Sequence, residues 1–334
     1  MSPQNSAIDA AFAGARIAIT GGLGFIGSTL AHRLVRLGSQ VTVIDSSLPG
    51  AGANPFNLAG IANRVTVVAA DIRDAAVLQP HLASCRVLFN LAAQTSHQGS
   101  MAEPLLDLDV NARAQLALLE ACRAVNPEIT IVFASTRQIY GRPEYLPVDE
   151  KHRIRPVDVN GVDKAAGEAF HLLFHDVYGM RCSALRLTNV YGPRMRIKDA
   201  RQTFIGVWLR AAVEGRAFEL WGGEQLRDLT YVEDAVDAFL LAATTPAVQG
   251  QALNIGGDGV VSLRQLAEAL VKANAGGDFV VREFPAERKR IDIGDYYADD
   301  GRFRQLTGWA PRTTLADGLA QALAFCRAHL PHYL

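Results

Sequence analysis

The fold is decided by Arg16-Ile17-Ala18-Ile19-Thr20-Gly21-Gly22-Leu23-Gly24-Phe25-Ile26-Gly27, a short apolar run that leads directly into spaced glycines. A helical pattern follows over Phe25–Leu37. In such a unit the first glycine permits the tight turn, the second lets the backbone approach a pyrophosphate, and the third lets helix and strand pack closely. The helix N-terminus offers N–H donors and a positive dipole end to the phosphates. We therefore predict a dinucleotide-binding turn, which involves Gly21, Gly24, Phe25, Ile26 and Gly27.

An acidic residue narrows the choice of cofactor. The second predicted strand, Gln40–Asp45, ends in a carboxylate. A carboxylate at this place can accept both hydroxyls of the adenosine ribose and would repel the 2′-phosphate of NADP. We therefore predict NAD, with Asp45 and Ser46 beside the ribose. The alternative is a merely tight strand–helix turn of another α/β protein, which the ordered series of strand, glycines, helix, strand and acid disfavours.

Short apolar runs alternate with helical-period segments along the first part of the chain, as in a parallel sheet flanked by helices. Val65-Thr66-Val67-Val68 is a continuous apolar run, as expected of a parallel strand buried on both faces. After about Tyr191 the alternation weakens. The predicted strands are Arg16–Thr20, Gln40–Asp45, Val65–Asp71, Val87–Ala93, Ile129–Ser135, Ser183–Val190 and Ala252–Gly256, and the predicted helices include Phe25–Leu37, Val110–Val125 and Asp163–Tyr178.

These patterns predict an α/β protein with a Rossmann-type doubly wound parallel sheet and a smaller C-terminal α/β substrate lobe. We assign residues 1–190 to an NAD-binding domain, to which residues 230–257 return. Residues 191–334 would form the substrate lobe. There is no internal repeat and no low-complexity linker.

Composition excludes several functions. The formal net charge of −1 gives no reason to expect a nucleic acid or a membrane surface as a partner. No apolar run approaches the roughly 20 residues that span a bilayer, and Met1–Ala15, which holds no Lys or Arg, reads as a short tail rather than a signal peptide. The four cysteines lack metal or disulfide spacing and read as free thiols. His171 and His175 lack a third ligand, so we expect no metal site. Because neither a membrane span nor a signal peptide is predicted, we expect a cytoplasmic protein.

Eight stretches of the sequence match the motifs of one known family. They are Thr20-Gly21-Gly22, Asp71-Ile72-Arg73-Asp74, Asn90-Leu91-Ala92-Ala93-Gln94, Ser135-Thr136-Arg137-Gln138-Ile139-Tyr140-Gly141, Lys164-Ala165-Ala166-Gly167-Glu168, Leu185-Arg186-Leu187-Thr188-Asn189-Val190-Tyr191-Gly192-Pro193-Arg194, Arg227-Asp228-Leu229-Thr230-Tyr231-Val232 and Leu306-Thr307-Gly308-Trp309-Ala310-Pro311. By these stretches the chain resembles the extended short-chain dehydrogenase/reductase family, in particular its nucleotide-sugar epimerases, dehydratases and decarboxylases. The resemblance covers nearly the whole chain in order, which makes it more specific than any single motif.

The resemblance implies further cofactor contacts and a homodimer. Asp71 and Ile72 would lie beside the adenine, and Leu91, Ala92 and Ala93 would line the cofactor cleft. The family often pairs through two helices that form a four-helix interface, and Val110–Val125 and Asp163–Tyr178 would be those helices.

The catalytic centre departs from the family. Its usual members carry a Tyr four residues before a Lys, with a Ser or Thr from the preceding strand end. Lys164 and Thr136 occupy the matching positions, but Asn160 stands where the tyrosine is expected. An amide has no proton to relay near neutral pH, although it can hydrogen-bond a hydroxyl. His97 is the candidate replacement base because a histidine can relay protons near pH 7; the alternative is a structural or exposed loop histidine.

Two neighbouring features narrow the reaction. Family dehydratases carry Asp-Glu directly after the catalytic Thr, whereas this chain has Arg137 and Gln138. That difference argues against ordinary 4,6-dehydration. We expect Tyr140 to pack beside the cofactor cleft rather than to act as the base.

The resemblance places the sugar nucleotide between the two lobes. Guanidinium groups suit phosphate oxygens because they offer paired donors with fixed geometry. The predicted substrate-binding residues are Gln94, Asn189, Arg194, Trp221, Arg227 and Arg290. The leading hypothesis is an NAD-dependent nucleotide-sugar epimerase that oxidises a sugar carbon transiently, through an atypical proton relay. The alternatives are an NAD- and nucleotide-sugar-binding protein without hydride transfer, and an atypical dehydratase or decarboxylase.

Overall fold

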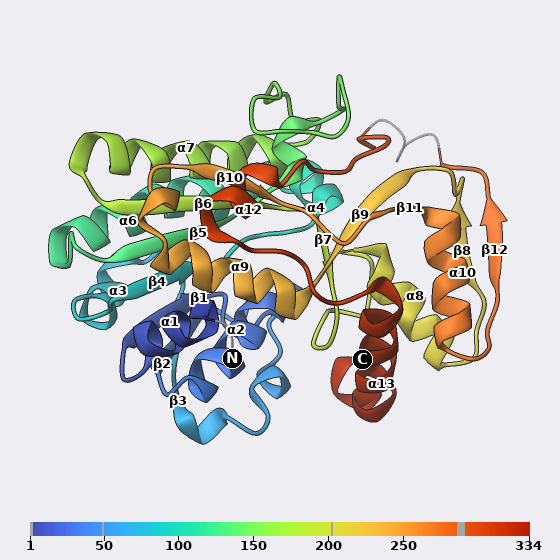
Figure 1. The fold of residues 1–334 in the computed structure, drawn as a ribbon, viewed down its shortest axis with the longest axis horizontal. Coiled ribbons are helices and arrows are strands. Elements are labelled where there is room, and N and C mark those ends of the chain that lie inside the picture. Colours follow the sequence, from blue (N-terminus) through green and yellow to red (C-terminus); the bar gives the residue numbers. More distant parts are fainter. Residues whose placement is uncertain (1–2, 49, 202, 286–290) are drawn as a thin grey trace.

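The computed structural model describes residues 3–48, 50–201, 203–285 and 291–334, and a seven-stranded parallel sheet lies at its centre (Figure 1). The order across the sheet is β10-β6-β5-β4-β1-β2-β3. All six neighbouring pairs are parallel, which confirms the Rossmann-type sheet. The strands of this sheet are β1 (Arg16–Thr20), β2 (Gln40–Asp45), β3 (Val65–Ala69), β4 (Val87–Asn90), β5 (Thr130–Thr136), β6 (Arg181–Leu187) and β10 (Ala252–Ile255).

Helices cover both faces of this sheet. On one face α9 packs against α2 and α1, and on the other α6 packs against α3 and α7 (Figure 1). The longest of them, α7, follows a capping Asp158 and ends at Gly179, whose left-handed backbone stops the helix. The helices are α1 (Pro3–Phe12), α2 (Phe25–Arg36), α3 (Ala75–Leu82), α4 (His97–Ala102), α5 (Pro104–Leu108), α6 (Ala114–Val125), α7 (Val159–Tyr178) and α9 (Val232–Thr244).

Most of the remaining elements form a smaller α/β lobe beside the carboxyl ends of the central strands (Figure 1). It holds a three-stranded sheet, β11-β9-β7, and a two-stranded sheet, β12-β8. A separate apolar core fills this lobe, with Trp208, Phe218 and Leu266 among its buried members. The elements of the lobe are β7 (Asn189–Tyr191), α8 (Phe204–Val213), β8 (Phe218–Trp221), β9 (Leu226–Tyr231), β11 (Val260–Ser262), α10 (Leu263–Ala273), β12 (Phe279–Arg282) and α13 (Leu315–His329). The short helix α12 (Gly301–Thr307) instead contacts β10 of the central sheet.

The chain crosses between the lobes more than once. The run predicted as one strand over Ser183–Val190 is split, because β6 ends at Leu187 and β7 pairs with β9 in the smaller lobe. After β9 the chain returns, and β10 pairs with β6 in the central sheet. The cofactor sheet and the smaller lobe are therefore joined at the end of β6, which is where a bound molecule would contact both.

Two expectations were wrong. The β3 strand lies at the sheet edge rather than between two strands, so its side chains are largely accessible and Val67 is 49% exposed. An apolar run alone does not distinguish an edge strand from a central one. The predicted N-terminal tail contains α1, whose Phe12 is buried beside Phe89 with ring centroids 6.3 Å apart.

Three further observations concern the part of the chain that the structure describes. Cys85, Cys122, Cys182 and Cys326 are buried free thiols. No cluster of three metal-ligating side chains occurs among the described residues. None of the described helices is both long and apolar enough for a membrane span.

Candidate active site

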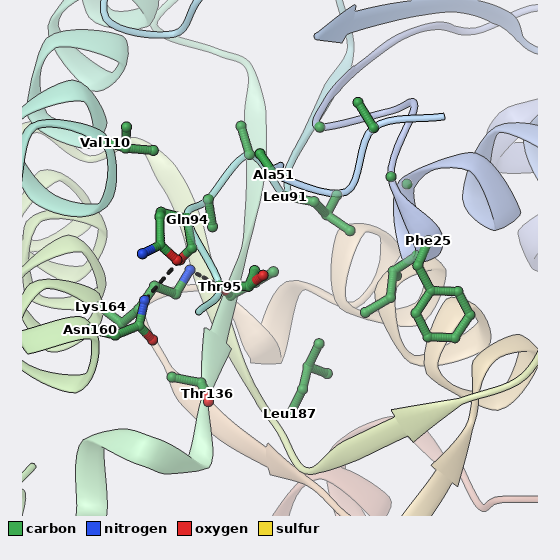
Figure 2. Close-up of a pocket in the computed structure, with 18 of the residues that line it drawn as sticks. Phe25, Ala51, Leu91, Gln94, Thr95, Val110, Thr136, Asn160, Lys164 and Leu187 are labelled. Carbon is green, nitrogen blue, oxygen red and sulfur yellow. Dashed lines mark hydrogen bonds between the residues drawn. The ribbon is translucent and has the colours of Figure 1, made fainter. Parts of the chain in front are cut away.

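A cavity lies at the carboxyl ends of β1, β2, β4 and β5 and extends to the start of β7 (Figure 2). This location is expected for ligands of open parallel sheets, where the strand order reverses. It brings together all of the residues predicted for the cofactor and all four predicted for catalysis. They are Gly21, Gly24, Phe25, Ile26, Gly27, Asp45, Ser46, Asp71, Ile72, Leu91, Ala92, Ala93, His97, Thr136, Asn160 and Lys164.

The glycine turn leaves no room for side chains. Gly21 has a φ of 69°, and a Cβ there would lie 2.9 Å from the backbone of Leu91. A Cβ at Gly27 would lie 2.4 Å from the carbonyl oxygen of Gly21. Gly24 is the N-cap of α2, and no side chain caps this helix. The first backbone N–H groups of α2 therefore remain available at the cavity wall, which suits the pyrophosphate of a dinucleotide.

Asp45 fixes the end of β2 against the glycine turn. The backbone N–H of Leu23 donates to its Oδ2 (3.0 Å) and that of Ser47 donates to its Oδ1 (2.9 Å). Burial raises the pKa of Asp45, and these two N–H groups partly offset that effect. Each carboxylate oxygen keeps a second lone pair, so Asp45 can also accept ribose hydroxyls in the cavity.

Lys164 lies beneath the cavity floor, one helical turn after Asn160. Its Nζ donates to the carbonyl oxygen of Ala134 (2.5 Å) and lies 4.1 Å from the ring centroid of Phe133. Burial lowers the pKa of Lys164 to about 7, although the carboxylates of Glu168 and Asp107 act in the opposite direction. This lysine therefore gives up its proton far more readily than an exposed lysine does.

Asn160 is held firmly in the place of the expected tyrosine. Its Nδ2 donates to the carbonyl oxygen of Gln94 (2.8 Å) and to Oδ2 of Asp107 (3.3 Å), and its backbone N–H donates to Ser100 (3.1 Å). Figure 2 shows the amide nitrogen directed at Gln94. Because both amide hydrogens are engaged, Asn160 can offer only its oxygen, as an acceptor, to a molecule in the cavity.

A carboxylate network lies behind Asn160. Asp107 is fully buried and also accepts a hydrogen bond from Asn111 (2.9 Å). Burial, followed by hydrogen bonding to Asp107, raises the pKa of Asp163 to about 7. Asp163 therefore binds a proton more readily than an exposed carboxyl does, because a second carboxylate lies beside it in a buried place.

His97 has a carboxylate partner. Its Nδ1 lies 2.8 Å from Oδ2 of Asp158, whose other oxygen caps α7 by accepting the N–H of Gly161 (2.7 Å). The Asp158 side chain is 1% exposed, whereas the His97 side chain is 34% exposed. Nδ1 of His97 also lies 3.2 Å from the side-chain amide of Gln138, whose nitrogen and oxygen exchange places by rotation.

Tyr140 is not available as a base. It is fully buried, donates to Asn254 (2.7 Å) and accepts from Arg186 (2.7 Å). Burial raises its pKa. The interpretation of Tyr140 as a packing residue is therefore consistent with its surroundings.

The two helical histidines are also structural. His171 is buried, bonds the carbonyl oxygen of Gly167 (2.7 Å) and stacks on Phe133. Burial lowers its pKa to about 4. His175 bonds the carbonyl oxygen of Met180 (2.8 Å), so in both rings Nδ1 is engaged by the backbone.

The predicted substrate residues are only partly brought together. Gln94 and Asn189 line the cavity, whereas Arg194 lines a second, basic cavity with Arg196, Lys198 and Arg201. Trp221 lies on β8, away from the cavity wall. Arg290 lies outside the described residues.

Arg227 is placed by the loop that contains Gly294. Its Nη1 donates to the carbonyl oxygens of Leu226 (2.8 Å) and Gly294 (2.5 Å), and Nη2 lies 3.7 Å from Asp292. Burial lowers its pKa to about 10, and the positive charge of Arg137 acts in the same direction. Two guanidinium groups therefore lie near each other at the boundary between the lobes.

Sequence reasoning missed Asp158, Asp107 and the position of Arg137. Asp158 had a usable signal, since an Asp directly before a helical run is a typical N-cap. The other two had none, because their partners are distant in sequence. Asp107 meets Asn160 only through the packing of α5 on α7.

Comparison with known proteins agrees with this geometry. Residues 17–256 match the NAD dependent epimerase/dehydratase family. The chain is 33% identical to a UDP-glucose 4-epimerase of Mycolicibacterium smegmatis, over 93% of this chain and 98% of that protein. It is 29% identical to a dTDP-glucose 4,6-dehydratase of Streptomyces griseus, over 93% and 94%. The solved UDP-glucose 4-epimerase of Thermotoga maritima with UDP-glucose has a TM-score of 0.86 at 27% identity, covering 94% of this chain and 99% of that one.

Proposed function

The chain belongs to the NAD dependent epimerase/dehydratase family, and on that premise we propose that it is a nucleotide-sugar epimerase in which His97, oriented by Asp158, replaces the usual tyrosine. NAD is the cofactor of this family. The observation that carries the proposal is the 2.8 Å contact between His97 Nδ1 and Asp158 Oδ2 at the wall of the same cavity as Thr136 and Lys164.

The histidine is suited to proton transfer by its partner. Asp158 favours the tautomer that carries a proton on Nδ1, which leaves the lone pair of Nε2 free. In this proposal Nε2 takes the proton of a sugar hydroxyl as that carbon is oxidised, and returns a proton when the ketone is reduced. Asp158 stabilises the imidazolium in between without itself accepting the proton, as buried aspartates do beside other catalytic histidines.

The neighbouring groups would orient the sugar and the cofactor. Thr136 accepts the N–H of Gln138 (3.2 Å), so its hydroxyl hydrogen is free to donate to the sugar. The Asn160 oxygen would accept a sugar hydroxyl hydrogen but cannot remove it. Lys164 would hold the nicotinamide ribose. NAD, when bound, supplies the hydride-transfer chemistry. Epimerisation requires the intermediate ketone to turn, or its neighbouring carbon to lose a proton, before reduction.

We also propose that the protein is a homodimer. The outer surface of α4 to α7 exposes many large apolar side chains, and an apolar surface of this kind marks an association site. A C2 pair would bury both copies of the surface at once. These side chains, which we call the helical apolar face, are Met101, Leu105, Leu108, Leu116, Val162, Leu173, Val177 and Tyr178.

One observation favours a second candidate function. Asn160 occupies the tyrosine position, as expected if the chain binds NAD and a nucleotide sugar without hydride transfer. A dehydratase relative is also known, but Arg137 and Gln138 replace the acids that dehydration uses.

A panel assay separates these functions. The purified protein is supplied with NAD and with UDP-, GDP-, CDP- and dTDP-sugars, while absorbance at 340 nm and the sugar products are followed. The epimerase predicts an isomerised sugar nucleotide from at least one of them. Binding of a sugar nucleotide with turnover of none would overturn the epimerase in favour of the binding protein, and loss of water or CO2 would identify the lyase instead.

A further inference from the structure

Arg137 is a cation without a partner in the part of the chain that the structure describes. It directly follows Thr136 and lines the cavity. Its Nε is buried with no hydrogen-bond partner, and no described carboxylate lies within 4.0 Å of its guanidinium. The ring centroid of Tyr296 lies 5.6 Å from Cζ of Arg137. A sheltered charge without a counter-ion is costly, so its retention requires an explanation.

The described carboxylates that act on the charge of Arg137 are hydrogen-bonded to other groups. Asp228, Asp292 and Asp158 are the carboxylates that stabilise its charge from a distance. Asp228 accepts from the hydroxyl of Thr188 (2.5 Å) and from the N–H of Ala298 (3.1 Å).

The other two acids are engaged in the same way. Asp292 accepts the N–H of Gly294 (3.0 Å) and faces Arg227. Asp158 caps α7 and faces His97. All three are held by other groups, so no described carboxylate forms an ion pair with Arg137, although the three stabilise its charge from a distance.

A second guanidinium increases the local positive charge. Arg227 is 5% exposed, and its Nε is buried with no hydrogen-bond partner among the described residues. The positive charge of Arg137 helps to lower the pKa of Arg227. Two like charges close together in a partly desolvated place favour the binding of an anion. Arg227 already faces Asp292 at 3.7 Å, so Arg137 is the guanidinium with which this anion would pair.

Of these two arginines Arg137 lines the cavity, whereas Arg227 is not among the residues of its wall. Arg227 belongs to β9 in the smaller lobe, where the resemblance places the diphosphate. Arg137 lies between Thr136 and Gln138, and the side chain of Gln138 reaches His97. Arg137 therefore lies at the end of the cavity that holds Thr136 and His97, where the sugar would react.

We propose that Arg137 binds a carboxylate carried by the sugar itself, so that the substrate class is a nucleoside-diphosphate uronic acid rather than a neutral hexose derivative. This inference rests on the proposed function for the orientation of the sugar nucleotide. A planar guanidinium matches a carboxylate through two parallel N–H···O bonds. A neutral hexose offers only hydroxyls at this place and would leave the charge of Arg137 unpaired.

The test compares equilibrium affinities by calorimetry for UDP, UDP-glucose and UDP-glucuronic acid, and for dTDP, dTDP-glucose and dTDP-glucuronic acid. The wild-type protein should bind the uronate of one series about 10-fold to 100-fold more tightly than its neutral counterpart, as expected for a charge-assisted hydrogen bond. Arg137→Gln should abolish this preference and leave the affinity for the free nucleotide within about twofold. Arg137→Lys, which keeps the charge without the fork, should keep a reduced preference.

Two further variants distinguish the ligand groups. Arg227→Gln should weaken the nucleotide and both sugar nucleotides alike. Arg181→Gln, at the opposite end of β6, removes an exposed guanidinium paired with Glu128 and should change nothing. Both Arg137 variants should keep the thermal unfolding temperature and NAD affinity of the wild type, because no native ion pair is lost.

The outcomes divide clearly. Equal affinity of the wild type for the uronate and the neutral sugar nucleotide in both series overturns the proposal, as does the absence of uronate binding. An equal loss of all ligands in Arg137→Gln overturns it as well, since Arg137 would then bind the diphosphate. A preference for the uronate that depends on Arg137 supports the proposed carboxylate site. If the bound uronate is not turned over, the proposed epimerase activity fails and the carboxylate site stands.

Discussion

His97 Nδ1 and Asp158 Oδ2 lie 2.8 Å apart, although they begin different helices, α4 and α7. Asp158 is the N-cap of α7, the helix that carries Asn160 and Lys164. A single carboxylate thus fixes the start of the catalytic helix with one oxygen and faces the candidate base with the other. The position of His97 is thereby coupled to that of the two residues that line the cavity behind it.

We predict that His97 and Asp158 contribute to kcat to different extents. His97→Ala should lower kcat by about 10²-fold to 10⁴-fold, the usual contribution of a general base, while NAD affinity is unchanged. Asp158→Asn should lower kcat by roughly 10-fold to 100-fold and alter the pH–rate profile, because an amide cannot stabilise the imidazolium. Asn remains a good N-cap, so the thermal unfolding temperature should be retained. Unchanged turnover in His97→Ala would remove this residue from the mechanism.

Asn160 should prove to be an anchor and not a base. Asn160→Ala removes the donor to Gln94 and Asp107 and leaves a buried carboxylate with one partner fewer, at a cost of about 1–3 kcal/mol in the free energy of unfolding. We expect kcat to fall by no more than about tenfold, far less than in His97→Ala. Urea unfolding and steady-state kinetics measure the two effects. A kinetic loss as large as that of His97→Ala would contradict the assignment of roles.

The local part of this structure could be predicted from the sequence. The strand before Gly21, the turn itself and Asp45 are neighbours in the chain, and their chemistry is set by residue type. The bounds of β1 and β2 agree with the prediction at both ends. A turn that needs glycine at φ 69° has few alternatives, which is why the cofactor end of the cavity was predictable.

The catalytic end depends on tertiary packing. The sequence pattern places Asn160 where a tyrosine is expected, but it does not show that the amide hydrogens are directed at Gln94 and Asp107. Nor does it show that a helix cap faces His97. The same limit applies to Arg137: in the sequence it is a charged residue next to Thr136, and the structure is needed to show that no described carboxylate pairs with it. Arg194 remains a predicted substrate residue, although it lies in a separate cavity.

The buried charge of Lys164 should make stability depend on pH. Its pKa is lowered from 10.5 to about 7 in the folded protein, so between these values the unfolded chain binds the proton and the folded chain does not. The wild type should therefore gain stability as pH rises through this window, by at most about 1.4 kcal/mol per pH unit. Lys164→Met lacks this gain, so its free energy of unfolding should be highest relative to that of the wild type near pH 6.5.

Urea titrations at several pH values between 6.5 and 9.5, at matched NAD occupancy, measure the difference between Lys164→Met and the wild type. Lys272→Met is the control, since Lys272 is exposed on α10. Its difference from the wild type should not vary with pH. A constant difference for Lys164→Met would show that Lys164 does not titrate in this window.

The helical apolar face should hold two copies together. Val177 is 59% exposed on α7, and Val177→Glu would place a charge in the proposed interface. We expect the wild type to sediment as a dimer and the variant to shift toward monomer. Val67→Glu, on the equally accessible edge strand β3, is the matched control and should stay dimeric. A monomeric wild type at micromolar concentration would contradict the proposal.

The last prediction concerns the choice of cofactor. Asp45 lines the cavity at the end of β2, where its charge would oppose a 2′-phosphate and its oxygens would accept ribose hydroxyls. Asp45→Ser removes both effects, so NAD affinity should fall by about 10-fold to 100-fold, the value of a hydrogen bond to a charged group. NADP affinity should rise or hold, because the repulsion is lost. The backbone N–H groups of Leu23 and Ser47 that Asp45 now satisfies would become available to the added phosphate.

Titrations of both cofactors, followed by protein fluorescence, give the ratio of the NAD affinity to the NADP affinity. If that ratio is the same in the variant and the wild type, discrimination must reside elsewhere, and the argument from the acid at the end of β2 fails even though the glycine turn still binds a dinucleotide.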